Sequence, residues 1–233
     1  MLAPKKKISK REIKQDKLVE NYFKVKSFYL DYQKFILGVG GAIVLIVFVA
    51  IFLSNKSKEN AEIANTELAR VFKLYDQSSY QQAIDGVPGK NIRGLKSIVE
   101  DYGSTESGET AKLYLANSYM NLSNIDEALK YYQDYSGDID LMKAASYAGI
   151  ASCFEVKNDL KEAAEYFMKA ARVVKNAAVT PEYLTNASRV YSLLGEKEKA
   201  KKILDQMKKD FPDTQFARDY DKYAAEFQIV YEK

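Results

Sequence analysis

The sequence predicts an all-α protein in which one N-terminal transmembrane helix is followed by an α-solenoid of stacked helix pairs. Two observations carry this prediction. Residues 35–53 contain no charged residue and no proline, and three later segments align with one another without internal gaps. Nineteen residues at about 1.5 Å of rise per residue approach the ~30 Å hydrocarbon core of a bilayer. Repeats of helix-turn-helix length are typical of stacked arrays.

The segment 1–34 is basic, with ten lysine or arginine residues against four acidic ones. Within residues 8–33 an apolar stripe recurs at helical spacing, formed by Leu18, Tyr22, Val25, Tyr29 and Tyr32. A basic amphipathic helix of this kind can lie on an anionic membrane surface. A solvated segment that only sets topology has the same composition, so both interpretations stay open.

The run 35–53 indicates a retained transmembrane anchor rather than a cleaved secretory signal. A signal has a shorter apolar core followed by a small-residue cleavage site, whereas Ser54, Asn55 and Lys56 follow this run. The basic N-terminal flank keeps the N-terminus in the cytoplasm and exports residues 54–233. Gly38, Gly41 and Ala42 form a small-residue patch that could admit another transmembrane helix closely.

The exported domain, residues 54–233, must hold together by packing alone. Beyond residue 34 acidic residues outnumber basic ones by three, which argues against a nucleic-acid-binding surface. The single cysteine, Cys153, cannot form an intramolecular disulfide. About 180 residues are enough for one domain with a substantial core.

Three repeats are predicted over residues 109–136, 144–175 and 181–212, at steps of 35 and 37 residues. Each begins with a small residue on a first helix, Ala116, Ala151 or Ser188. An aromatic residue, a turn residue, an alanine and two apolar residues then follow at fixed offsets: Tyr119, Ser123, Ala128, Tyr132 and Tyr135; Phe154, Asn158, Ala163, Phe167 and Ala170; Tyr191, Gly195, Ala200, Leu204 and Met207. Small residues at both crossing points allow two helices to approach closely.

Two further segments flank the repeats. Residues 59–102 indicate a degenerate helix pair, whose helices are separated by a loop from Gln77 to Lys90. At the other end, residues 214–231 have the period of a solvent-capping helix.

Residues that support catalysis are missing from the sequence, so we predict no enzyme, no cofactor and no metal site. There is no histidine, the commonest general base and metal ligand. Cys153 lies in an apolar helix without a base to activate it. Gly89 and Lys90 do not complete a phosphate-binding loop, because Ile84 and Asn91 occupy two of its required positions.

The repeat pattern resembles the tetratricopeptide repeat, a family of helix-turn-helix units about 34 residues long. The resemblance covers residues 108–212, and Gly195 and Pro212 make the third copy the closest match. Lys112, Tyr147 and Leu184 stand where the family has tryptophan, which marks a divergent member. The resemblance implies a curved array that binds protein partners.

By this resemblance, a partner-binding groove would be lined from the first helix of each repeat. Its expected residues are Leu113, Asn117, Met120, Asn121, Ala148, Ser152, Glu155, Thr185, Arg189 and Ser192. They do not reproduce the basic clamp with which some members hold a C-terminal carboxylate. The alternative is that the protein's own C-terminal helix occupies the groove.

The whole layout resembles the YfgM-like ancillary subunits of the SecYEG translocon and related Bacteroidetes tetratricopeptide membrane proteins, chiefly in residues 14–26, 98–105 and 128–136. The resemblance implies a single-pass bacterial inner-membrane protein whose periplasmic array links the translocon channel to periplasmic chaperones or emerging chains. It implies no small-molecule substrate. A scaffold of another envelope assembly or secretion complex remains an alternative, as does an outer mitochondrial receptor, which requires the opposite topology.

Overall fold

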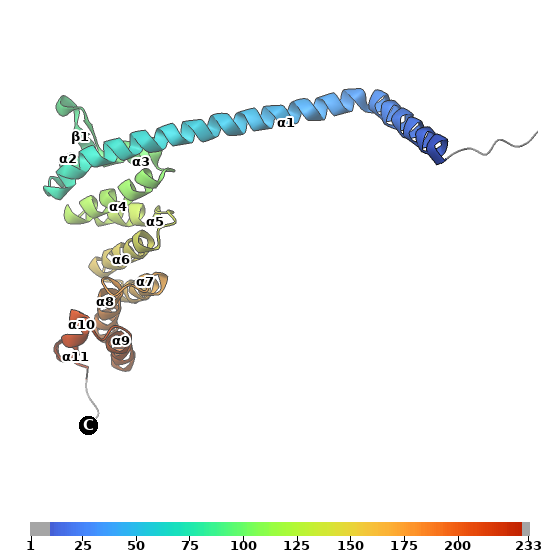
Figure 1. The fold of residues 1–233 in the computed structure, drawn as a ribbon. Helices are drawn as coiled ribbons and strands as arrows, with labels where there is room; N and C mark the ends of the chain where they lie inside the picture. Colours follow the sequence, from blue (N-terminus) through green and yellow to red (C-terminus); the bar gives the residue numbers. More distant parts are fainter. Residues whose placement is uncertain (1–9, 230–233) are drawn as a thin grey trace, which may run out of the picture. The chain divides into compact units, whose positions relative to one another are not determined.

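The structure is a computed structural model that describes residues 10–229. The chain divides into two compact units, Met1–Lys56 and Ser57–Lys233, and each is described by itself. Helix α1 (Lys10–Asp76) belongs to both units, because it continues unbroken across the boundary between them (Figure 1). The sequence predicted separate helices in this region, but no glycine-rich or proline-containing segment interrupts α1 between Lys56 and Asp76.

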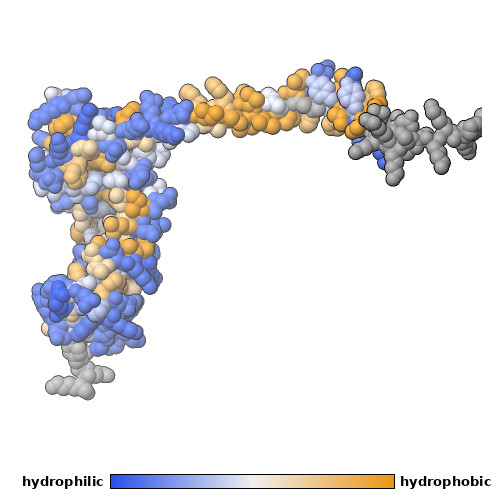
Figure 2. Space-filling model, viewed as in Figure 1, coloured by the Kyte–Doolittle hydropathy of each residue, from blue (hydrophilic) through white to orange (hydrophobic). Residues whose placement is uncertain are grey.

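In the first unit, the apolar part of α1 has no partner among the described residues. The large apolar side chains described within residues 35–53 are between 43% and 70% exposed. Mean hydropathy reaches 2.7 within Leu37–Asp76, and α1 is the described helix that is long and apolar enough to cross a membrane. Figure 2 shows this stretch as a continuous hydrophobic surface.

The second unit begins with the last turns of α1, then α2 (Tyr80–Asp85) and α3 (Leu95–Tyr102). The segment Gln77–Lys90 is not the loop that the sequence predicted. It contains α2, strand β1 (Gly86–Val87) and the 3-10 turn η1 (Pro88–Lys90), and β1 pairs antiparallel with β2 (Ile92–Arg93). Gly86 has φ 81°, and a Cβ there would lie 2.4 Å from the Ile92 carbonyl oxygen, so only glycine fits.

Three regular helix pairs follow: α4 (Glu106–Asn121) with α5 (Ile125–Gln133), α6 (Asp140–Val156) with α7 (Leu160–Val173), and α8 (Thr180–Leu193) with α9 (Lys197–Asp210) (Figure 1). This arrangement confirms the predicted all-α solenoid. The small residues at the predicted crossings are fully buried, as Ala151 and Ala163 show at 0% exposure. In the third pair, the buried Ser188 hydroxyl donates to the Ala200 carbonyl at 2.8 Å, which satisfies the polar group at the crossing.

The turns inside the three pairs share one backbone geometry. Ser123, Asn158 and Gly195 have φ of 59°, 61° and 82°. The next amide N–H in each case donates to a carbonyl five residues earlier, on Tyr119, Phe154 or Tyr191. This bond closes the first helix with a Schellman motif, so the turn residue reverses the chain.

The C-terminal segment differs from the single capping helix predicted over 214–231. It forms α10 (Gln215–Arg218) and α11 (Tyr220–Glu226), which are separated at Asp219. Helix α11 ends at Glu226 because Gln228 has φ 53° and the Ile229 N–H bonds back to the Ala224 carbonyl at 2.9 Å. Residues 230 and 231 lie outside the described residues. Ala217, Tyr220 and Phe227 pack into the core of the last two helix pairs.

Candidate functional site

The expected groove residues lie on the first helices of the regular pairs, α4, α6 and α8. Leu113 and Thr185 are buried, at 8% and 6% exposure, so their side chains belong to the packed interior. Asn121 is exposed, and the others are half-buried. Of the ten, the eight that are not buried remain accessible enough to contact a partner.

Two expected groove residues pair with each other across neighbouring repeats. The Arg189 guanidinium on α8 donates to both carboxylate oxygens of Glu155 on α6, at 2.6 Å and 2.8 Å. The hydrogen bonds from Arg189 to Glu155 outweigh the effect of burial and raise the pKa of Arg189. This bidentate pair ties two repeats together and neutralises both charges.

The small polar groove residues bond mainly within the chain. The Asn117 side-chain oxygen accepts from the Tyr132 hydroxyl, and the Asn121 amide donates to the Asn117 carbonyl at 2.8 Å. The Ser152 hydroxyl donates to the Ala148 carbonyl at 3.0 Å. These groups are already satisfied, so a partner would be held here mostly by shape and apolar contact.

The end of the predicted groove meets the chain's own C-terminal segment. The Ser192 hydroxyl on α8 donates to the backbone carbonyl of Phe227, just beyond α11. Phe227 is buried, at 7% exposure. The Ser192 position is therefore occupied from within the molecule, whereas no such bond reaches the other nine groove residues within residues 10–229.

The small-residue patch in α1 is open. Gly38, Gly41 and Ala42 are exposed, and a Cβ built on either glycine would meet no atom within 4 Å. Within the described chain, nothing covers this face of α1. The patch stays a predicted packing site for a second transmembrane helix.

Cys153 is a core residue. Its thiol is fully buried, and burial raises its pKa to about 11, so the nucleophilic thiolate is disfavoured at neutral pH. Its sulfur lies 4.0 Å from the Met120 sulfur. Among residues 10–229, no group of histidine, cysteine or acidic side chains has the geometry of a metal site.

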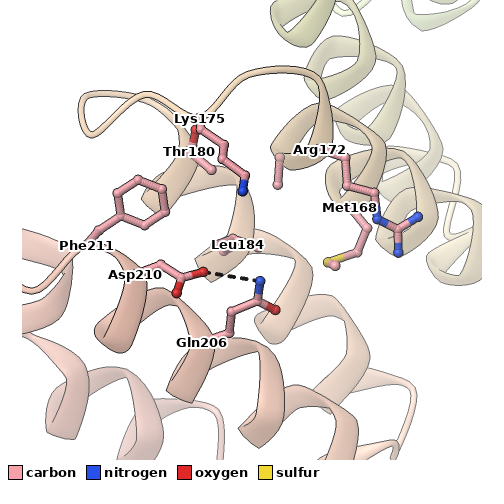
Figure 3. A pocket seen from close by; sticks show the side chains of 9 residues that line it. Met168, Arg172, Lys175, Thr180, Leu184, Gln206, Asp210 and Phe211 are labelled. Atoms are coloured by element: carbon pink, nitrogen blue, oxygen red, sulfur yellow. Dashed lines mark hydrogen bonds between the residues drawn. The ribbon is translucent and has the colours of Figure 1, made fainter.

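A second candidate site, not found from the sequence, is a cavity of about 570 Å³ among α7, α8 and α9. Figure 3 shows its mouth, with Lys175 and Arg172 on one side and Gln206 and Asp210 on the other. The lining residues come from two repeats: Met168, Ala171, Arg172, Lys175, Thr180, Leu184, Gln206, Asp210 and Phe211. Two cations spaced by three residues near the end of a predicted helix were the only sequence signal for it.

Comparison with solved structures supports the repeat architecture. A crystal structure of a variant form of Podosopora anserina putative kinesin light chain nearly identical TPR-like repeats matches with a TM-score of 0.51 and 12% identity. The match covers 73% of this chain and 98% of that one. Another structure of these repeats matches at a TM-score of 0.49 and 12% identity, over 72% and 96% of the two chains. At this identity the likeness shows the fold alone.

Sequence comparison identifies the family through the repeat unit. No curated protein matches the chain. A family model described as the coatomer epsilon subunit matches residues 105–233, which include all three regular helix pairs. TPR-like folds and this family are typical of non-enzymatic scaffolds, which agrees with the inert surroundings of Cys153. Because the match spans more than half of its length, the chain belongs to the coatomer epsilon subunit family.

Proposed function

We propose that this protein is a membrane-anchored adaptor whose repeat array binds protein partners. The observation that carries the proposal is the combination of an apolar, fully exposed helical stretch with a separately packed TPR-like unit. The first favours a bilayer and the second favours protein contacts. Membership in a family named for a subunit of a larger assembly also favours a binding role.

The finer proposal is that the protein is an ancillary subunit of the Sec translocon. In this role the N-terminus lies in the cytoplasm, the array lies in the periplasm, and the partners are the translocon channel, periplasmic chaperones or emerging chains. The basic N-terminal flank supports this topology. The residue-level resemblance to YfgM-like proteins supports this choice of partner.

A second candidate is a scaffold subunit of a different envelope assembly or secretion complex. The family match favours this candidate, because it indicates an assembly subunit without naming the translocon. Both candidates use the same anchor and the same array, so they differ only in the identity of the partner.

Crosslinking in cells separates the two candidates. A photoreactive amino acid is placed at Asn117, Ser152 or Arg189, one on the first helix of each regular pair, and the captured proteins are identified by mass spectrometry. The first proposal expects the translocon channel or a periplasmic chaperone among the products. Consistent capture of another envelope complex would replace it with the second candidate.

A matched control uses the exposed residue Lys202 on α9, a second helix rather than a first helix. Products obtained equally from Lys202 and from the three groove positions would indicate random encounter. In that case the groove would lose its assignment as the binding face, and both candidates would need another surface.

A further inference from the structure

The cavity among α7, α8 and α9 has an apolar floor beneath a charged rim (Figure 3). Ala171 and Leu184 are buried, at 7% and 4% exposure, and Met168 and Phe211 are half-buried beside them. Its volume of about 570 Å³ falls in the range of roughly 300–1,000 Å³ that is typical of ligand sites. A floor of this kind gains most from an apolar side chain that displaces water.

The rim carries two cations without a partner. Arg172 and Lys175 are exposed, and neither makes an ion pair or a hydrogen bond with any residue in the range 10–229. Many other cations of the repeat unit are paired, as Arg189 is with Glu155 and Lys157 is with Asp126. Two free cations over an apolar floor are complementary to a carboxylate attached to an apolar group.

The opposite rim has a different character. The Gln206 amide donates to the Asp210 carboxylate at 3.4 Å, and both side chains are exposed. Asp210 can accept from a peptide N–H, and the Gln206 carbonyl oxygen can do the same. A carboxylate on this rim would repel the anionic headgroup of a lipid, so the rim as a whole fits a peptide better.

A cavity at the equivalent place in the first regular pair has the opposite charge. It has a volume of about 500 Å³, lies between α4 and the segment before α6, and is lined by Glu106, Glu109 and Asp138 among others. No basic residue lines it. The free cations are therefore a property of the α7–α9 cavity and not of the repeat in general.

We propose that the α7–α9 cavity binds a partner protein through an acidic peptide segment that carries a bulky apolar side chain. The apolar side chain lies on the floor formed by Ala171 and Leu184, flanking carboxylates pair with Arg172 and Lys175, and Asp210 accepts from the peptide backbone. The site is separate from the predicted groove, so it stands whether or not the groove binds the partner proposed above.

The test measures the binding of a fluorescein-labelled peptide, Ser-Glu-Leu-Glu-Phe-Glu-Ser, to the full chain in detergent by fluorescence anisotropy. We expect saturable binding that is weakened at least about tenfold when lysines replace the glutamates of the peptide. The double variant Arg172→Glu with Lys175→Glu should also bind at least about tenfold more weakly. A benzophenone-bearing peptide should crosslink within residues 168–184 or 206–211.

The matched control is Lys161→Glu with Lys202→Glu, which reverses two exposed charges on the same helices, α7 and α9, outside the cavity. Equal weakening in both double variants would show unspecific attraction and overturn the proposal, as would no binding at about 1 mM protein. Phosphatidylglycerol vesicles that compete the peptide away through Arg172 and Lys175 would assign the site to lipid instead. If the charge reversal lowers the melting temperature, Arg172→Gln with Lys175→Gln replaces it.

Discussion

The two units of this chain contain similar apolar residues in opposite surroundings. In residues 35–53, Phe35 and Phe48 are 70% exposed, whereas Leu115, Leu204 and Met207 in the repeat pairs are 0% exposed. The repeat unit buries its apolar side chains between its own helices. Residues 35–53 bury none among the described residues, so a bilayer is the surrounding that removes them from water.

The largest expected effect comes from charges placed in the middle of the apolar run. Val44→Lys together with Val47→Lys should abolish membrane retention, because each lysine near the bilayer centre costs about 2.5–3.5 kcal/mol. Alkaline extraction of a membrane fraction measures the loss. The control Glu59→Lys changes the charge of the same helix outside the run and should leave retention unchanged. A doubly charged variant that stays in the pellet would contradict the anchor.

Overpacking a helix crossing should give the next largest effect. Ala151 is fully buried on α6, so Ala151→Phe should lower the free energy of unfolding by about 1–3 kcal/mol. Lys157→Phe, on the exposed C-terminal cap of α6, should change it by less than about 1 kcal/mol. Urea denaturation of both variants measures the difference. Equal stabilities would show that Ala151 does not lie at a close crossing.

Alkaline pH should destabilise the repeat unit through Cys153. Burial raises the pKa of its thiol from 9.0 to about 11, so the folded state keeps a proton that the unfolded state releases. The contribution of Cys153 is fully present below pH 9 and is lost as the pH rises to about 11. Its magnitude is on the order of 1–2 kcal/mol. Melting curves across this interval should fall less steeply for Cys153→Ala, and parallel curves would count against a buried neutral thiol.

The helix-reversing turns should respond according to their left-handed backbone. Gly195→Ala places a Cβ at φ 82° and should cost about 1 kcal/mol. Asn158→Gly should change stability by less than about 0.5 kcal/mol, because asparagine tolerates this conformation. Thermal unfolding of both variants provides the comparison. A larger loss for Asn158→Gly than for Gly195→Ala would contradict the equivalence of the two turns.

The regular pairs could be predicted because their period is written in the chain. Small residues such as Ala151 and Ala163 mark the crossings, and Ser123, Asn158 and Gly195 mark the turns. The hairpin of β1 and β2 could not be predicted, since strands of two residues have no periodicity to read. The end of α11 was also missed, because it depends on the backbone conformation of one residue, Gln228.

The two candidate sites differ in the same way. The groove positions follow from the repeat register, but the Glu155–Arg189 pair and the contact of Ser192 with Phe227 depend on which helices become neighbours in space. The α7–α9 cavity combines Arg172 and Lys175 with Asp210, which lies 35 residues after Lys175 in the sequence. Only folding brings these three side chains to one rim, so no local pattern could reveal the cavity.

The most direct test of the account compares the full chain with residues 57–233 alone in a membrane fractionation at alkaline pH. The account predicts that the full chain stays with the membrane, while residues 57–233 remain in the supernatant and unfold in one cooperative transition. Release of the full chain would contradict the anchor. Membrane retention or non-cooperative unfolding of residues 57–233 would contradict the independence of the repeat unit.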